Sequence, residues 1–421
     1  MNTVFKLLAF SLTVCAPVAA QVVPEATSGR GLPIRGTLHY DLRYSQTAEF
    51  SGDLGDWQSA IVSGDVNYSN GKQRYPFMLN YGGGYSWTIS GPELNDGFFQ
   101  HVMLSQGIVR RKWSLTFSDS VSFTPIAPTT GFSGTPGTGE PIGQPNPAPP
   151  SGESILNVKT RAISSNATGG LSIILNSSTN LSVGGGSSLL DYPDGNAIDT
   201  NSWMANASLN RRLNARNSLS AAYSYTQYSY PGRSDTFLTN SAIFSYTRQW
   251  TRRLSTHAGI GPDWVDIANA SSSSQGGTPP TPTVPNSTVL GVDAGVMYDM
   301  KFGSAGLNFS QGTNGGAGYL IGAQSDNINA DYSREFGRDL TVGVTANYMR
   351  TAGLENGGVT NAKYFGTQAT RRVGRYISVF GNYTAIMQSS SSALNANALS
   401  GLLQVVSFGI GYSPRETHLR H

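Results

Sequence analysis

The most constraining feature of this sequence is an alternation of apolar and polar residues that recurs along almost its whole length. In the first such segment, Leu38, Tyr40 and Leu42 share one face, while His39 and Asp41 share the other. Successive side chains of a β-strand point to opposite sides, so each segment forms a strand with one apolar and one polar face. The segments run about 9 to 14 residues, longer than most globular strands and suited to a tilted strand that crosses a bilayer.

The links between these segments alternate between short and long. Short polar turns packed with arginine centre near Leu213, Trp250, Phe336 and Val373, and the first pair and the last pair are each separated by 37 residues. Longer links rich in Ser, Asn, Gly and Pro lie between such turns, one of them after Asn269. A repeated hairpin with short turns at one end and long loops at the other is typical of transmembrane β-barrels.

The number of alternating segments sets the size of the barrel. We count 18 segments between residues 34 and 413, with 16 as the fallback because the alternation weakens near Arg161 and Gly303. We therefore predict an all-β fold, an antiparallel transmembrane β-barrel of about 18 strands with short periplasmic turns and long extracellular loops. A barrel of this size is wide enough to leave an aqueous lumen.

The start of the chain resembles a secretory signal peptide. Lys6 precedes an apolar core that ends at Val14, and Ala20 occupies a small position before a cleavage site. We expect cleavage after Ala20 and a short periplasmic segment over 21–33. The alternative is lipoprotein processing at Cys15, although Val14 stands where that processing needs Gly, Ala or Ser.

Composition excludes several other classes of protein. Cys15 is the only cysteine, so the mature chain forms no disulfide and no thiolate metal site. Charged residues make up 13% and the net charge of +3 is too small to indicate nucleic acid. None of the histidines has a metal-ligand spacing, and His39 with Asp41 is too common a pair to predict a membrane hydrolase. We expect no enzyme, no catalytic residue, no metal and no cofactor.

The polar faces consist mostly of Ser, Thr, Asn and Gly, as at Asn206, Ser224 and Asn327. Short neutral groups of this kind suit water and small polar solutes. A few charged residues interrupt them, and they either pair with one another or line a constriction; pairing is favoured because an unpaired buried charge costs several kcal/mol. The charged candidates for the lumen wall are Arg35, Asp41, Arg43, Asp65, Asp119, Asp293 and Asp331.

Most of the positive charge falls at the predicted short turns, on the periplasmic side. Solvated turn residues are the simplest interpretation, and a phospholipid-headgroup anchor or an anion-attracting vestibule are the alternatives. The residues of this basic rim are Arg211, Arg212, Arg248, Arg252, Arg253, Arg334, Arg338, Arg371, Arg372 and Arg375.

Aromatic residues gather near both ends of the predicted strands. Tyr246 and Trp250 represent those beside short turns, whereas Trp203, Tyr228 and Tyr230 lie toward the long loops. Two such belts are expected at the two interfaces of a membrane.

Two segments do not belong to the strand pattern. The stretch 124–153 is too rich in Pro and Gly for a strand or helix, and it either folds inward as a constriction or extends outside as a flexible loop. The residues 414–421 form a polar C-terminal tail. The barrel itself is thus predicted over 34–413.

The hairpins, the aromatic belts and a last strand ending in Phe408, Ile410 and Tyr412 resemble the bacterial outer-membrane β-barrel class, especially uncharacterised porins. The resemblance covers nearly the whole mature chain and rests on no specific motif. It implies the outer membrane of a Gram-negative cell, contact with outer-membrane lipid, and assembly by machinery that reads a C-terminal aromatic residue. The chain departs from that class by continuing from Ser413 to His421.

Three functions are compatible with such a barrel. Passive diffusion of small polar solutes through a porin-like channel fits a neutral lumen best. Export or uptake of a polysaccharide or another specific substrate is the first alternative, and a surface adhesin or structural barrel is the second. A homo-oligomer stays open, because a lipid-facing surface and a subunit contact are both apolar.

Overall fold

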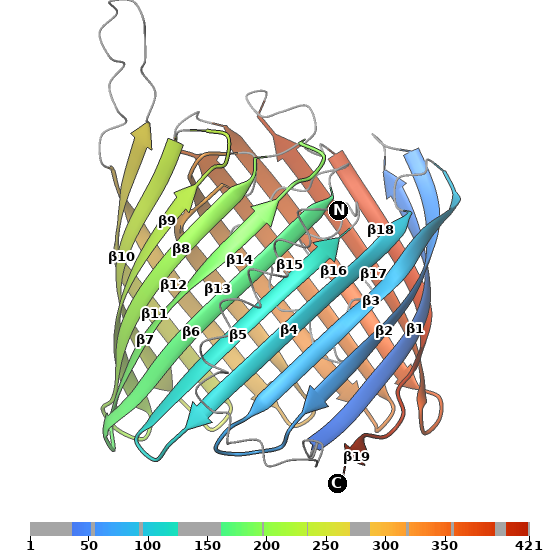
Figure 1. Ribbon diagram of the computed structural model, residues 1–421, viewed down its shortest axis with the longest axis horizontal. Coiled ribbons are helices and arrows are strands. Elements are labelled where there is room, and N and C mark those ends of the chain that lie inside the picture. Colours follow the sequence, from blue (N-terminus) through green and yellow to red (C-terminus); the bar gives the residue numbers. More distant parts are fainter. Residues whose placement is uncertain are drawn as a thin grey trace, which may run out of the picture.

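In the computed structural model, the alternating segments pair with their neighbours in sequence order and close into a barrel (Figure 1). The structure describes residues 36–51, 55–91, 96–124, 161–195, 198–233, 235–269, 287–316, 320–354, 358–391 and 401–419. Eighteen strands of these residues form the wall, and all of their pairings are antiparallel. These residues contain no helix that is long and apolar enough to span a membrane.

The strands have the following bounds. The first nine are β1 (Gly36–Ser51), β2 (Gly55–Ser69), β3 (Phe77–Ser90), β4 (Gly97–Val109), β5 (Trp113–Thr124), β6 (Ala162–Asn176), β7 (Thr179–Asp191), β8 (Thr200–Arg212) and β9 (Asn217–Ser229). The others are β10 (Asp235–Gln249), β11 (Leu254–Asn269), β12 (Ser287–Met300), β13 (Gly303–Asn314), β14 (Ala323–Phe336), β15 (Leu340–Gly353), β16 (Val359–Arg372), β17 (Ile377–Ser390), β18 (Gly401–Tyr412) and β19 (Thr417–Leu419).

The barrel closes where the first strand meets the last long one. β1 pairs with β18 over ten positions, from Leu42 opposite Tyr412 to Ser51 opposite Leu403. Below this seam the short strand β19 continues the pairing, with Gly36 opposite Leu419. Closure leaves no long strand edge unpaired, which removes the usual site of edge-to-edge aggregation.

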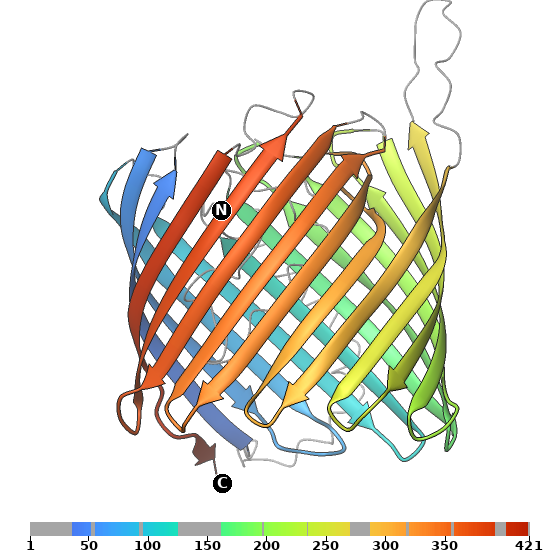
Figure 2. The ribbon, with the colours of Figure 1, turned by 180° about the vertical axis from the view of Figure 1, so that it is seen from behind.

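The predicted 18-strand antiparallel barrel is confirmed. The alternation in the sequence predicts a first strand over 34–45. This strand differs most from its prediction, since it continues to Ser51. The turns that follow the even-numbered strands, among them the arginine-rich ones, all lie at one end of the barrel, which we call the short-turn end (Figure 2). The predicted signal peptide, the segment 21–33, Arg35 and the loop from 125 to 153 lie outside the described residues.

The pairing register separates the wall into an apolar outer face and a mainly polar lumen face. Large apolar side chains on the outer face are widely exposed, for example Leu42 at 53%, Phe244 at 65% and Phe408 at 67%. Polar side chains on the other face are buried, as at Ser45 and Ser407. Alternation in the sequence thus becomes a difference between outside and inside.

Gly261 marks a point where two strands of the wall approach closely. The neighbouring Pro262 has no backbone N–H to donate, and the β10–β11 pairing is interrupted opposite Ala242 and Ile243. A Cβ atom on Gly261 would overlap the carbonyl oxygen of Ala242. The site therefore needs a residue without a side chain.

Gly261→Ala is expected to destabilise the barrel by about 1 to 3 kcal/mol, because the backbone must move to admit the methyl group. Gly169→Ala on β6 is the matched control, since no atom lies within 4 Å of its Cβ position. The measurement is the temperature at which the detergent-extracted protein changes its gel mobility. An equal effect of both substitutions would contradict the assignment of a close approach at Gly261.

Candidate functional site

The lumen wall divides into arcs of different chemistry. Apart from Arg212 at the end of β8, the arc from β5 to β9 carries neutral side chains at its inward positions, mainly hydroxyl and amide groups separated by glycines. Hydroxyl pairs join its strands, with Ser118 Oγ 2.7 Å from Thr168 Oγ1 and Ser188 Oγ 2.7 Å from Ser202 Oγ. This arc offers hydrogen-bonding groups without charge.

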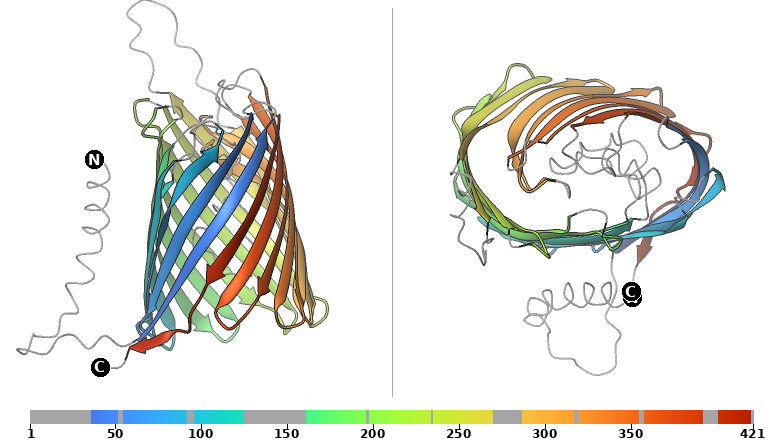
Figure 3. Two further views of the ribbon diagram at one scale, coloured as in Figure 1. Left: turned by 90° about the vertical axis from the view of Figure 1, so that its right-hand side faces the viewer. Right: turned by 90° about the horizontal axis from the view of Figure 1, so that it is seen from above.

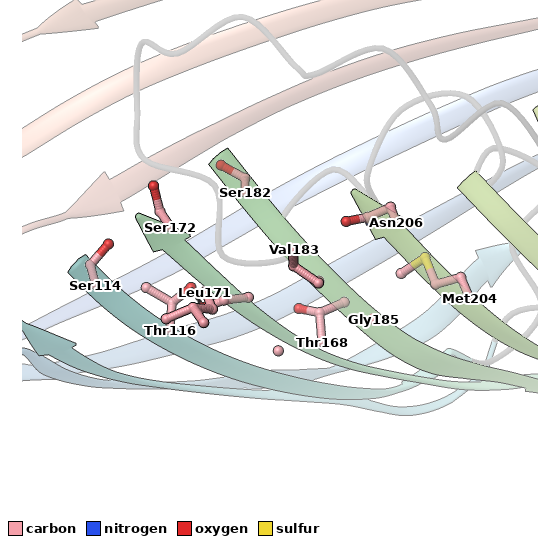
Figure 4. Close-up of a pocket in the computed structure, with 13 residues that line it drawn as sticks. Ser114, Thr116, Thr168, Leu171, Ser172, Ser182, Val183, Gly185, Met204 and Asn206 are labelled. Atoms are coloured by element: carbon pink, nitrogen blue, oxygen red, sulfur yellow. Dashed lines mark hydrogen bonds between the residues drawn. The ribbon is translucent and has the colours of Figure 1, made fainter. Parts of the chain in front are cut away.

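A shallow pocket lies on this neutral arc (Figure 4). Ser114, Thr116 and Thr168 line it together with Ser172, Ser182 and Asn206, from strands β5 to β8. Glycines in the same strands hold the surface open, because their positions carry no side chain. Such a surface suits water or a small polar solute.

The arc from β1 to β4 carries both signs of charge. Arg43 Nη2 lies 4.0 Å from Asp65 Oδ2, and His101 Nε2 lies 3.7 Å from Asp65 Oδ1. His101 also hydrogen-bonds Asn80, and His39 Nε2 lies 3.3 Å from Asp41 Oδ1. Arg43 is the one lysine or arginine of this cluster, and His39 and His101 add positive charge only when they are protonated. Asp65 therefore has a cationic partner within the wall itself rather than across the lumen.

The residues on β1, β2 and β3 explain how this charged cluster fits against the lumen wall. Asp41 faces Asp65 in the register of β1 and β2, so two carboxyl groups meet and need a donor nearby. Gly82 on β3 leaves the space that Asp65 and His101 occupy, and a Cβ atom there would overlap both side chains. The Asp65 side chain is only 2% exposed, which makes its donors important.

The arc from β11 to β14 is acidic. Asp263 on β11, Asp293 on β12 and Asp331 on β14 all take inward positions in the register. His257 Nε2 lies 3.0 Å from Asp293 Oδ1. The sequence analysis did not select Asp263, although its alternation with Gly261 and Val265 places it on the same face as His257.

Apolar residues also face the lumen, which the sequence analysis did not predict. They lie where each strand nears the end opposite the short turns. Several of their outward neighbours, such as Met387 and Leu402, are apolar as well, so the alternation is lost there. The buried set is Trp57, Ala362, Tyr364, Ile386, Leu403 and Val405. Their packing makes this stretch of wall rigid.

The ends of β13 and β14 leave the wall and turn into the barrel. β12 pairs with β13 only as far as Val292 opposite Gln311, whereas β13 and β14 stay paired up to Asn314 opposite Ala323. The view from above shows orange strands curving inward (Figure 3). We call residues 312–316 and 320–325 the inward hairpin.

Hydrogen bonds fasten the inward hairpin to the wall beyond β12. The Tyr230 hydroxyl donates to Gly315 O at 2.9 Å and accepts from Gly322 N–H at 3.0 Å. Thr239 Oγ1 on β10 lies 2.9 Å from Thr313 Oγ1. Ile321 packs with Tyr230 and with other apolar side chains of β10 and β11. The hairpin thus spans a corner of the lumen and narrows it.

Three residues take positions other than those expected from the sequence. Asp119 faces outward, because it shares a face with Leu115 and Phe117 while Ser118 and Ser120 face the lumen. Tyr228 faces inward and its ring lies tilted against that of Phe237, with ring centroids 5.6 Å apart. Tyr230 is 1% exposed and holds the inward hairpin. Neither tyrosine belongs to an outer aromatic belt.

The other expected residues are placed as follows. Asp41, Arg43, Asp65, Asp293 and Asp331 face the lumen, and Asp41, Arg43 and Asp65 lie together. The ten arginines of the basic rim lie at the short-turn end, either in turns or in the last residues of strands. In the described part of the chain, no three His, Cys, Asp or Glu residues gather as a metal site.

Comparisons with known proteins found solved structures of low similarity to this chain. No protein-family model and no curated protein matches the chain. Among solved structures, OccK2 (OpdF) of Pseudomonas aeruginosa is 12% identical, with 91% of this chain and 99% of that chain covered and a TM-score of 0.47. OccAB2 of Acinetobacter baumannii is 8% identical, with 91% and 99% covered and a TM-score of 0.49. Identities this low do not assign a function.

Tyr230→Phe is expected to loosen the inward hairpin, because it removes the hydroxyl that joins Gly315 and Gly322. The loss should be about 1 to 3 kcal/mol of local stability, the cost of leaving buried backbone groups unpaired. Amide hydrogen exchange of the inward hairpin is the measurement. Tyr223→Phe on β9, the strand that ends just before Tyr230, is the matched control, since its outward hydroxyl bonds only Asn240 in the described residues. If the exchange rates of the inward hairpin are unchanged in Tyr230→Phe, the Tyr230 hydroxyl does not hold the hairpin in place.

Proposed function

We propose that this protein is a porin-like channel of the bacterial outer membrane that allows passive diffusion of small polar solutes. One observation carries the proposal: a closed barrel has an apolar outer face and a polar lumen face. In lipid every backbone polar group must be satisfied internally, and a closed barrel of paired strands meets that requirement.

The strand lengths support a membrane-spanning barrel. The wall strands contain 12 to 16 residues. At about 3.3 Å per residue and a tilt of about 40°, such strands rise roughly 30 to 40 Å, enough to cross a hydrocarbon core of about 30 Å. The apolar outer face would then meet lipid rather than water.

Cation–π pairs at the short-turn end support contact with lipid headgroups on that side. Arg248 lies 3.8 Å from the Trp250 ring centroid, and Arg110 lies 4.8 Å from that of Tyr75. Arg334 lies 5.1 Å from the Phe336 ring. Aromatic rings and arginines at one level are the usual anchors at a membrane interface. We propose that this is the periplasmic end.

The lumen favours diffusion of small solutes over the alternatives. Hydroxyl and amide groups of the neutral arc can hydrogen-bond water and polyols without holding them tightly. The inward hairpin narrows the lumen, which disfavours transit of a polysaccharide. A surface adhesin would need no such polar lining. We assign no catalytic role. Assembly by the barrel-assembly machinery and a homo-oligomeric state stay predictions.

Reconstitution of the detergent-purified mature chain into liposomes tests the proposal. Swelling in neutral sugars should be fast with monosaccharides and should decline as the sugar grows, because the inward hairpin limits the opening. Protein-free liposomes and liposomes with heat-unfolded chain are the controls. An absence of swelling with every sugar would reject an open pore.

Asp119→Leu is expected to stabilise the barrel in lipid by about 1 to 2 kcal/mol, because a carboxyl group on the lipid face is unfavourable. Asp119 Oδ1 has no hydrogen-bond partner among the described residues. Ser118→Leu, one position away on the lumen face, is the control and should give no gain. Urea unfolding in liposomes is the measurement, and destabilisation by Asp119→Leu would indicate a partner for the carboxyl group instead.

A further inference from the structure

Charge is distributed unevenly around the lumen. By the pairing register, and leaving out the two terminal residues at each end of every strand, six carboxyl groups face inward from the described strands, while Arg43 is the one lysine or arginine that does so. The six are Asp41, Glu49, Asp65, Asp263, Asp293 and Asp331. The lumen wall thus carries an excess of negative charge, although the whole chain is slightly positive.

The two sides of the lumen differ in the cationic partners of these carboxyl groups. Asp41 and Asp65 have Arg43, His39 and His101 beside them on β1 to β4. Asp263, Asp293 and Asp331 have no lysine or arginine partner among the described residues, and His257 is the only cationic type within reach. We call these three aspartates the acidic arc.

Asp263 lies at the narrowed part of the lumen. Its residue is 4% exposed, and its Oδ1 atom has no hydrogen-bond partner among the described residues. Oδ1 lies 3.0 Å from the Cβ position of Gly291 on β12, and Oδ2 lies 3.6 Å from that of Gly312 in the inward hairpin. The carboxyl group therefore sits between the wall and the hairpin, where side chains are missing on both sides.

Asp293 and Asp331 continue the arc toward the short-turn end. The Asp293 side chain is 48% exposed and can meet passing solutes directly. Asp331 on β14 fills the space above Gly306 on β13. Between them, the inward positions of β13 hold Ser304, Asn308 and Ser310, which are neutral. Nothing of positive charge in the described strands interrupts the arc.

We infer that the acidic arc makes this lumen select cations and cationic solutes over anions. The inference rests on the proposed channel function and names its substrate class. Carboxylates in a confined lumen with low-dielectric walls raise the local concentration of cations and lower that of anions. The effect extends over about one Debye length, roughly 8 to 10 Å at physiological salt, so it acts where the hairpin narrows the path.

Reversal potentials across a planar bilayer test the inference. A single full-length mature barrel is inserted and a KCl gradient is applied at neutral pH. We expect a potassium-to-chloride permeability ratio of roughly 3 or more. The variant Asp263→Asn/Asp293→Asn/Asp331→Asn keeps the side-chain volumes, and its ratio should fall toward one while the conductance persists.

Two further variants keep the test decisive. Asp326→Asn is the matched control, because Asp326 lies on β14 with Asp331 but faces outward, 3.4 Å from Arg350; its ratio should equal that of the parent. Asp293→Asn alone changes a half-exposed residue and should fold even if the triple variant does not. It should lower the ratio in part.

Each outcome has a distinct meaning. An anion-selective or unselective parent channel overturns the inference, and so does a parent ratio that the triple or single substitution leaves unchanged. Sugar-driven swelling without cation preference would keep the proposed function and reject the acidic arc. Absence of both conductance and swelling would reject the channel and the inference with it.

Discussion

Hydrogen bonding between the first and last long strands is the constraint on which the rest of this structure depends. Each wall strand pairs with two neighbours, and the ten paired positions between β1 and β18 remove the two edges that an open sheet would leave. Once the sheet is closed, every strand has an inside and an outside. The chemistry of both surfaces then follows from which residues fall on each face.

Because the strands of the closed barrel pair in a fixed register, the position of a residue along its strand decides whether its side chain faces the lumen or the outside. Neighbouring residues of a strand face opposite sides of the wall, and a shift of the register by one residue would exchange the two sides. Asp119 therefore lies outward among apolar residues, although its neighbours in the sequence are serines that face the lumen. Tyr228 lies inward for the same reason. The wall tolerates such exceptions because most of its residues still follow the pattern.

The lumen is not uniform, and its differences suit a selective channel. The neutral arc provides a polar, uncharged surface of hydroxyl and amide groups on one side of the lumen. A cluster on β1 to β4 places Arg43, His39 and His101 beside its aspartates, whereas the acidic arc has no lysine or arginine partner among the described residues. The inward hairpin brings Asp263 and the narrowed path together, so size and charge act at the same level.

The sequence by itself determined the class of the fold, the strand number and most strand bounds, because a period of two and the turn spacing are local properties. It also determined that Asp41, Arg43, Asp65, Asp293 and Asp331 share the polar face. Only the tertiary structure decided that Tyr230 reaches Gly315 and Gly322, residues 85 and 92 positions away. Contacts between distant strands depend on register, closure and curvature, which no local pattern encodes. The inward hairpin and the burial of Asp263 beneath it arise from register, closure and curvature acting together.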